Sequence, residues 1–223
     1  MSSRCILCDI IAGKPWVPFR SLYSPQEAES EVLLESENFV VIADVAPIVE
    51  GHLLIIPKVH SFALACLEPL FLEELASLQD RVVAAQTREY TRPILFEHGA
   101  GTTVGSSAAC IDHAHLHVTP VQHDPSAEFR GSFAFKPVAH LSDLRPEGTR
   151  SAYLYYEDRD GRRWGTETTS VPRQFFRRVL CATQDVPVPW DWRSFLSPLA
   201  ISRTRELVSS ARRRLLPQLT SKE

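Results

Sequence analysis

Apolar and polar positions alternate in a way that predicts three strands in the first quarter of the chain. Residues 31–35 and 39–43 are short apolar runs, and polar residues 36–38 between them suit a turn. Residues 52–57 are apolar after the first position, which indicates a well-buried strand. We therefore expect a strand pair followed by a third strand inside a sheet.

The clearest helical pattern covers residues 69–89, where apolar residues recur at roughly helical spacing between charged ones. Pro69 suits the first helical position. A strand over 94–96, a loop rich in Gly, Ser and Thr, and a further strand at 113–119 follow. This order predicts the α+β class, with one helix packed on a small antiparallel sheet.

The pattern changes after residue 123, so we divide the chain into a region 1–123 and a C-terminal extension 124–223 packed on it. The extension is predicted to mix strands and helices. Its expected elements are a short strand at 132–135, a hairpin over 152–164 with Asp160-Gly161 in the turn, a helix from Pro172 and a last helix over 203–216.

Three histidines alternate with apolar residues in the strand at 113–119. A strand has a side-chain period of two, so His113, His115 and His117 should share one face and the apolar residues the other. Imidazole is largely neutral near pH 7, which suits metal binding, proton transfer or nucleophilic attack. This strand is therefore predicted to have a buried back and a chemically active front.

Composition narrows the classes of function. The 223 residues are 44% hydrophobic and 23% charged with a net charge of −3, which is typical of a soluble globular protein with no need of a nucleic acid partner. No apolar run is long enough to span a membrane, and the N-terminus has no signal-peptide pattern, so we expect a cytoplasmic protein. The five cysteines include Cys5-x-x-Cys8, which favours reduced thiols or metal ligands over disulfides.

The triad strand, the segment DVAPIVEGHLLIIPKVH at 44–60 and the opening CILCDIIAGKPWVP together resemble the histidine triad (HIT) nucleotide-binding family over roughly residues 4–122. The resemblance implies a hydrolase or transferase that cleaves a nucleoside 5′-phosphoramidate, a dinucleoside polyphosphate or a related nucleotide conjugate. It also implies a homodimer.

The resemblance assigns roles to individual residues. His115 would attack the phosphorus and carry the nucleotidyl group, and His117 would bind the phosphoryl oxygens or assist the leaving group. Asp44 would hold the ribose hydroxyls, although an aspartate that ends a strand can equally serve a turn. The base pocket would be lined by apolar residues that could also be plain core: Ile6, Leu7, Ile10 and Ile42.

Zinc-bearing members of the family imply a structural site made of Cys5, Cys8, His52 and His113. Two cysteines two residues apart have a spacing common in such sites. The alternative is a pair of reduced buried cysteines beside a histidine that orients the triad. The remaining candidates, His60 and His98, have the weaker claim and are interpreted as structural or surface residues.

Two departures from the family pattern keep other functions open. Cys110, a poor donor, stands where the family has Ser or Thr, and it follows Ala108-Ala109, so Ser106 or Ser107 would have to contact the phosphoryl group instead. The alternatives are a catalytically weak nucleotide-binding or regulatory protein, and a pathway-specific nucleotidyl transferase with a dedicated acceptor.

The extension also carries polar residues in its predicted helix and after it. Each could meet a phosphate or carboxylate, but aromatic residues beside arginines also make ordinary helix packing, which we favour. These residues are Gln174, Arg177, Arg178 and Arg193.

Overall fold

The computed structural model describes residues 5–14, 32–99, 111, 113–147, 151–186, 190–196 and 198–220. Its α-helices are α1 (Ile6–Ile11), α3 (Pro69–Glu89), α4 (Ser126–Ser132), α5 (Phe175–Thr183) and α6 (Pro198–Thr220). Three 3-10 helices are η1 (Leu64–Cys66), η2 (Leu141–Leu144) and η3 (Trp192–Leu196).

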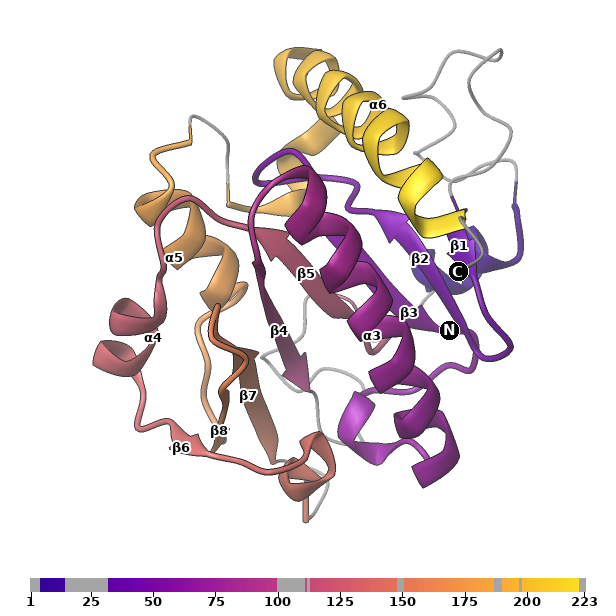
Figure 1. Cartoon of the computed structure of the whole chain (residues 1–223). Coiled ribbons are helices and arrows are strands. Elements are labelled where there is room, and N and C mark those ends of the chain that lie inside the picture. The colour runs from indigo at the N-terminus through magenta and orange to yellow at the C-terminus, as the bar shows by residue number, and fades with distance from the viewer. Residues whose placement is uncertain are drawn as a thin grey trace.

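The strands are β1 (Val32–Glu35), β2 (Phe39–Ala43), β3 (Leu53–Pro57), β4 (Pro93–Gly99), β5 (Leu116–Pro120), β6 (Lys136–Pro137), β7 (Ala152–Glu157) and β8 (Arg163–Thr168). They form one antiparallel sheet in the order β1-β2-β3-β5-β4-β7-β8-β6 (Figure 1). The expected α+β class is confirmed. The strands predicted at the start of the chain and the long helix are found within a residue or two of their expected bounds.

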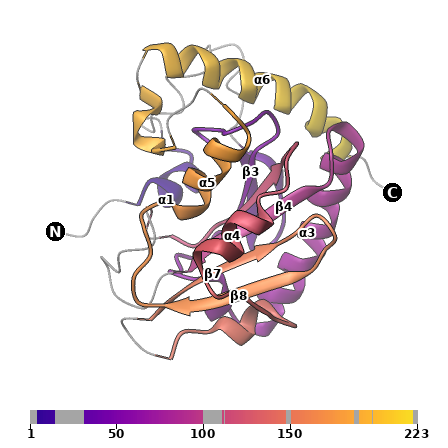
Figure 2. The same ribbon diagram turned by 90° about the vertical axis from the view of Figure 1, so that its left-hand side faces the viewer.

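Helices cover both faces of this sheet. On one face α3 packs on apolar residues of the central strands, among them Leu116 and Val118 of β5, and α6 packs on α3 and on β1 and β2 at the edge of the sheet. On the other face α1 packs on β2 and β3, while α4 and α5 pack on β4 and β7, so α1 and α5 lie opposite α3 (Figure 2). The side chain of His117 points to this second face, as the alternation along β5 predicts.

The extension continues the sheet of the first region. Strand β7 pairs with β4 over five residues, so β4 is bonded to β5 on one side and to β7 on the other. A Cβ atom at Gly99 would lie 2.0 Å from the ring of Tyr153, so this pairing requires glycine there. The hairpin with its Asp160-Gly161 turn and the two helices of the extension are found where the sequence indicates, although α6 is longer than predicted.

Three expectations on local structure are wrong. The strand expected at 113–119 begins only at Leu116, so His113 and His115 precede β5 and only His117 lies in it. Residues 132–135 form no strand, because α4 runs to Ser132 and the chain pairs with β8 only at β6. Strand β4 extends to Gly99, so His98 belongs to the sheet and not to a loop. Among the residues that the structure describes, no helix has the length and apolar character to cross a membrane.

Candidate active site and metal centre

The backbone fixes the protonation of His115. Its Nδ1 lies 2.7 Å from the carbonyl oxygen of His113, which can only accept a hydrogen bond. The neutral ring therefore carries its proton on Nδ1 and keeps a lone pair on Nε2. Burial lowers the pKa of His115, so the ring stays neutral at physiological pH. His115 thus has the electronic form of a nucleophile.

The proton on His117 follows from a chain of hydrogen bonds. The amide of Ile48 donates to Nδ1 of His52 at 3.3 Å, so His52 carries its proton on Nε2. That Nε2 lies 2.9 Å from Nδ1 of His117, which then accepts, and the proton of His117 sits on its own Nε2. Burial holds the pKa of His117 well below 6.5. A neutral N–H donor therefore stands next to His115, whose ring centroid is 4.8 Å away.

Asp44, at the end of β2, accepts hydrogen bonds from two donors and faces His52. Its Oδ1 accepts from the amide of Ala46 at 2.9 Å, which is the turn contact expected of an aspartate that ends a strand. Its Oδ2 accepts from Nη1 of Arg177 at 2.8 Å and lies 3.3 Å from Nε2 of His52. Burial alone would raise the pKa of Asp44, but His52 and the Arg177 guanidinium outweigh it and lower the pKa.

These groups line one cavity between α1 and α5. Of the residues the structure describes, it is lined by Ile6, Leu7, Asp44, Val45, Leu54, His98, Ile111, His115, His117, Gln174, Arg177 and Trp192. The predicted Ile6, Leu7, Asp44 and both histidines are thus brought together. Ile10 and Ile42 are buried in the apolar cluster beneath α1 and do not line it. Ser107 lies outside the described residues.

Three lining residues come from the extension, where the sequence favoured packing. Arg177 is buried, and its ion pair with Asp44 contradicts that interpretation. Gln174 is buried too and holds the 190–192 segment through Asp191 Oδ1 and the Trp192 amide. Arg178 packs as expected, over the ring of Trp190 at 5.0 Å. The sequence carried no signal that told these arginines apart.

His98 of β4 also lines the cavity, although the sequence gave it a weak claim. Its ring packs on Phe176 with centroids 4.9 Å apart. Its Nε2 is buried without a hydrogen-bond partner within the described part of the chain. Burial lowers the pKa of His98 to about 3, so this nitrogen belongs to a neutral ring.

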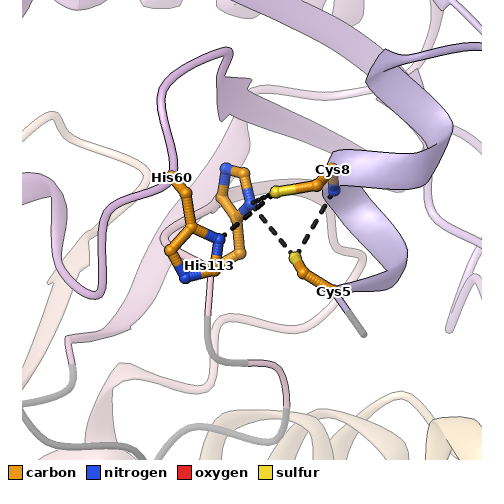
Figure 3. Close-up of side chains that lie close together, drawn as sticks. All are labelled: Cys5, Cys8, His60 and His113. Carbon is orange, nitrogen blue, oxygen red and sulfur yellow. Dashed lines mark hydrogen bonds between the residues drawn. The ribbon is translucent and has the colours of Figure 1, made fainter. Parts of the chain in front are cut away.

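A second cluster joins the start of α1 to the triad segment. The ligand atoms of Cys5, Cys8, His60 and His113 all lie within 4.8 Å of one another, and the two thiols face both imidazoles (Figure 3). Nε2 of His113 donates to the carbonyl of Pro57 at 2.9 Å, so its Nδ1 has a free lone pair. That Nδ1 lies 3.3 Å from each sulfur. Two sulfurs and two nitrogens at these separations fit a tetrahedral zinc ion, whose bonds are about 2.0–2.3 Å long.

The fourth residue of this cluster is His60 and not His52, which we expected from the sequence. In the antiparallel register Leu53 pairs with Val118, so His52 lies opposite Thr119, six residues past His113. Thr119 lies near the last residue of β5, whereas His113 comes before its first residue, Leu116, so the two positions are at opposite ends of this strand. His60 follows the other end of β3, next to the Pro57 carbonyl that His113 contacts. The register, which the sequence does not state, decides which histidine meets the thiols.

Comparison with known proteins identifies the region that carries Asp44, His60 and the three histidines of the triad. The family model described as HIT domain matches residues 25–124. Residues 25–124 of the chain form a HIT domain. HIT proteins are generally nucleotide hydrolases or transferases.

The relatives of this HIT protein are distant. An uncharacterized HIT-like protein of Mycobacterium tuberculosis is 28% identical over 116 residues, which are 52% of this chain and 70% of that protein. Adenosine 5′-monophosphoramidase HNT1 of Saccharomyces cerevisiae is 27% identical over 126 residues, covering 56% and 68%. A solved Zn-bound histidine triad family protein of Mycobacterium smegmatis is 26% identical, covers 52% and 73%, and superposes with a TM-score of 0.38.

The buried histidines of this HIT protein predict a loss of stability in acid. Burial lowers the pKa of His52 to about 4 and that of His98 to about 3, whereas an unfolded histidine titrates near pH 6.5. Between these values only the unfolded state binds the protons, so the free energy of unfolding should fall as the pH drops from about 6.5 toward 4. At about 1.4 kcal/mol per pKa unit, His52 alone should account for roughly 3 kcal/mol.

Urea unfolding at a series of pH values measures this fall. His98→Leu should make it shallower, because one of the buried histidines that titrate is gone. The matched control His123→Leu removes an exposed imidazole and should leave the slope as in the wild type. Identical slopes in the wild type and in His98→Leu would contradict the prediction.

Proposed function

We propose that this HIT protein cleaves the phosphorus bond of a nucleoside 5′-phosphoramidate or a related nucleotide conjugate through a nucleotidyl-His115 intermediate. The observation that carries the proposal is the protonation pattern of the triad. His115 has a lone pair on Nε2, and its neighbour His117 has an N–H on Nε2. A nucleophile and a proton donor therefore stand side by side in one cavity.

In the first step Nε2 of His115 forms a bond to the phosphorus, and the bond from phosphorus to the leaving nitrogen breaks. The N–H on Nε2 of His117 donates a hydrogen bond to the leaving nitrogen, which departs as the amine with a proton taken from solvent. In the second step water attacks the phosphorus, the His115–phosphorus bond breaks, and the water proton is released to solvent. The products are the amine and the nucleoside monophosphate, so atoms and charges balance over the cycle.

The apolar wall of the cavity supports binding of the base. The apolar lining residues are Ile6 and Leu7 of α1, Leu54 of β3, and Ile111, which precedes the triad histidines. Ring faces of nucleobases suit such a surface, because apolar contact needs no hydrogen-bond pattern. We infer that α1 supplies the base site, and that His117 of β5 and His115 just before it supply the chemistry.

We infer that Cys5, Cys8, His60 and His113 hold a structural zinc ion. Zinc would tie α1 to the segment before β5. The same segment supplies the carbonyl of His113 that orients His115, so a fixed His113 also fixes the nucleophile. His113 then has a structural role and takes no part in proton transfer.

The test is product chromatography after incubation of the full chain with adenosine 5′-phosphoramidate, its guanosine counterpart and diadenosine polyphosphates. Release of nucleoside monophosphate supports the proposal, and the best substrate names the leaving group. Binding of nucleotide without release would favour the catalytically weak binding protein instead. Release that needs an added acceptor would favour the dedicated transferase.

A further inference from the structure

The extension places an arginine where the cavity would receive the phosphoryl group. Nη1 of Arg177 and Nδ1 of His117 lie 2.8 and 3.8 Å from the same oxygen, Oδ2 of Asp44. The guanidinium also donates to the carbonyls of Ala46 at 2.6 Å and Trp190 at 3.0 Å. These three contacts use three of the five N–H groups of an arginine and leave two for a ligand.

The fold holds Arg177 firmly in this place. Gln174, one turn earlier, has the left-handed backbone angles φ 55° and ψ 40°, which cost a non-glycine residue energy. Its side chain bonds Asp191 and the backbone of Trp192, and so fixes the segment whose Trp190 carbonyl receives Arg177. Only 4% of Arg177 is exposed. Its guanidinium is therefore oriented before any ligand arrives.

The ion pair changes what Asp44 can offer a substrate. A carboxylate has about four acceptor sites, and Asp44 already receives the amide of Ala46 and Arg177 and faces His52. About two sites remain, and Oδ2 lies 3.3 Å from Nε2 of His52, so little of the carboxylate is open to the hydroxyls of a ribose. An unpaired Asp44 would also repel an anionic phosphoryl group beside His117. Arg177 removes this repulsion.

A polar atom in the same cavity points to a ligand independently. Nε2 of His98 is buried and has no partner within the described residues, although buried polar atoms are normally paired. It lines the cavity with His115, His117 and Arg177. A phosphoryl oxygen at this position would give the atom a partner. Cys110 is a poor donor for that role by its chemistry.

We propose that Arg177 is the phosphate-binding residue of this protein: the extension supplies a guanidinium that contacts the nonbridging phosphoryl oxygens and keeps Asp44 neutralised. The proposal rests on the proposed function, because it assumes that a nucleotide phosphoryl group enters this cavity. It makes the extension part of the substrate site. It also predicts that the phosphate, more than the ribose, is what the site recognises.

Calorimetric binding of AMP and of adenosine to the full chain tests this. The wild type should bind AMP at least about tenfold more tightly than adenosine, and R177M should lose that preference while its adenosine affinity stays within about twofold. R177K should keep part of the preference, because it retains a charge without the planar fork. R178M, which removes the exposed neighbour on the same helix, should bind both ligands as the wild type does.

A purely structural role for Arg177 gives a different result. In that case R177M weakens both ligands equally or neither, and the proposal is overturned. If R177M does not fold, the wild type and R177K still test the proposal through their preference for AMP over adenosine. Equal affinities of the wild type for AMP and adenosine overturn the proposal directly. The ratio of AMP affinity to adenosine affinity does not depend on turnover. A wild type that prefers AMP but releases no nucleoside monophosphate from the substrates therefore contradicts the proposed function and not this proposal.

Discussion

His115→Ala should abolish the release of nucleoside monophosphate, with a loss of at least about a thousandfold, because no other group described in the cavity has an oriented free lone pair next to a proton donor. The measurement is the initial rate with adenosine 5′-phosphoramidate. His123→Ala, which removes an exposed imidazole, is the matched control and should react at the wild-type rate.

The same variant can reveal the covalent step. Rapid acid quenching of the wild type during turnover should give protein heavier by one nucleotidyl group, and the adduct should be missing from His115→Ala. The fold should survive, since alanine loses one hydrogen bond, from Nδ1 to the His113 carbonyl, and the ring contact with His117. A variant that still turns over and still carries the adduct would rule out His115 as the nucleophile.

Of the variants proposed here, replacement of both Cys5 and Cys8 by serine should cause the largest loss of stability. Without two of its four ligands the site no longer binds zinc, and metal binding energy is folding energy. We expect a loss of roughly 4 kcal/mol or more in the free energy of unfolding. Activity should fall as well, because His113 orients His115 through its carbonyl.

Thermal melting together with elemental analysis checks this. Cys181→Ser, which changes a cysteine outside the cluster, should melt like the wild type and keep its zinc. A strong chelator should lower the melting temperature of the wild type and leave the double variant unchanged. Protein that contains no zinc and melts alike in both forms would disprove the metal site.

Local patterns predicted the parts of this fold that depend on near neighbours. The alternation along β5 correctly placed His117 and Leu116 on opposite faces, and the Asp160-Gly161 pair correctly marked the hairpin turn. Residues 126–137 were misread, because a seven-residue helix and a two-residue strand are too short to show a period. The second strand that pairs with β4, β7, lies more than fifty residues further along the chain, and no local pattern reveals this pairing.

The site shows the same limit. The sequence predicted His115 and the two cysteines, because each belongs to a compact motif. It chose His52 over His60, because the choice depends on the register between β3 and β5. It assigned Arg177 to packing, because a helical pattern tells which side of α5 is buried but not that Asp44 lies opposite.

The double pairing of β4 also bears on how the protein is made. A nascent chain that has emerged only as far as β5 has the triad histidines but leaves one edge of β4 unpaired, and such edges recruit other chains. The edge closes only once β7 has left the ribosome, and Asp44 meets its counter-ion later still, when α5 appears. Synthesis therefore closes the sheet before it completes the pocket, and a chain cut off before β7 would expose an unpaired strand edge that favours aggregation.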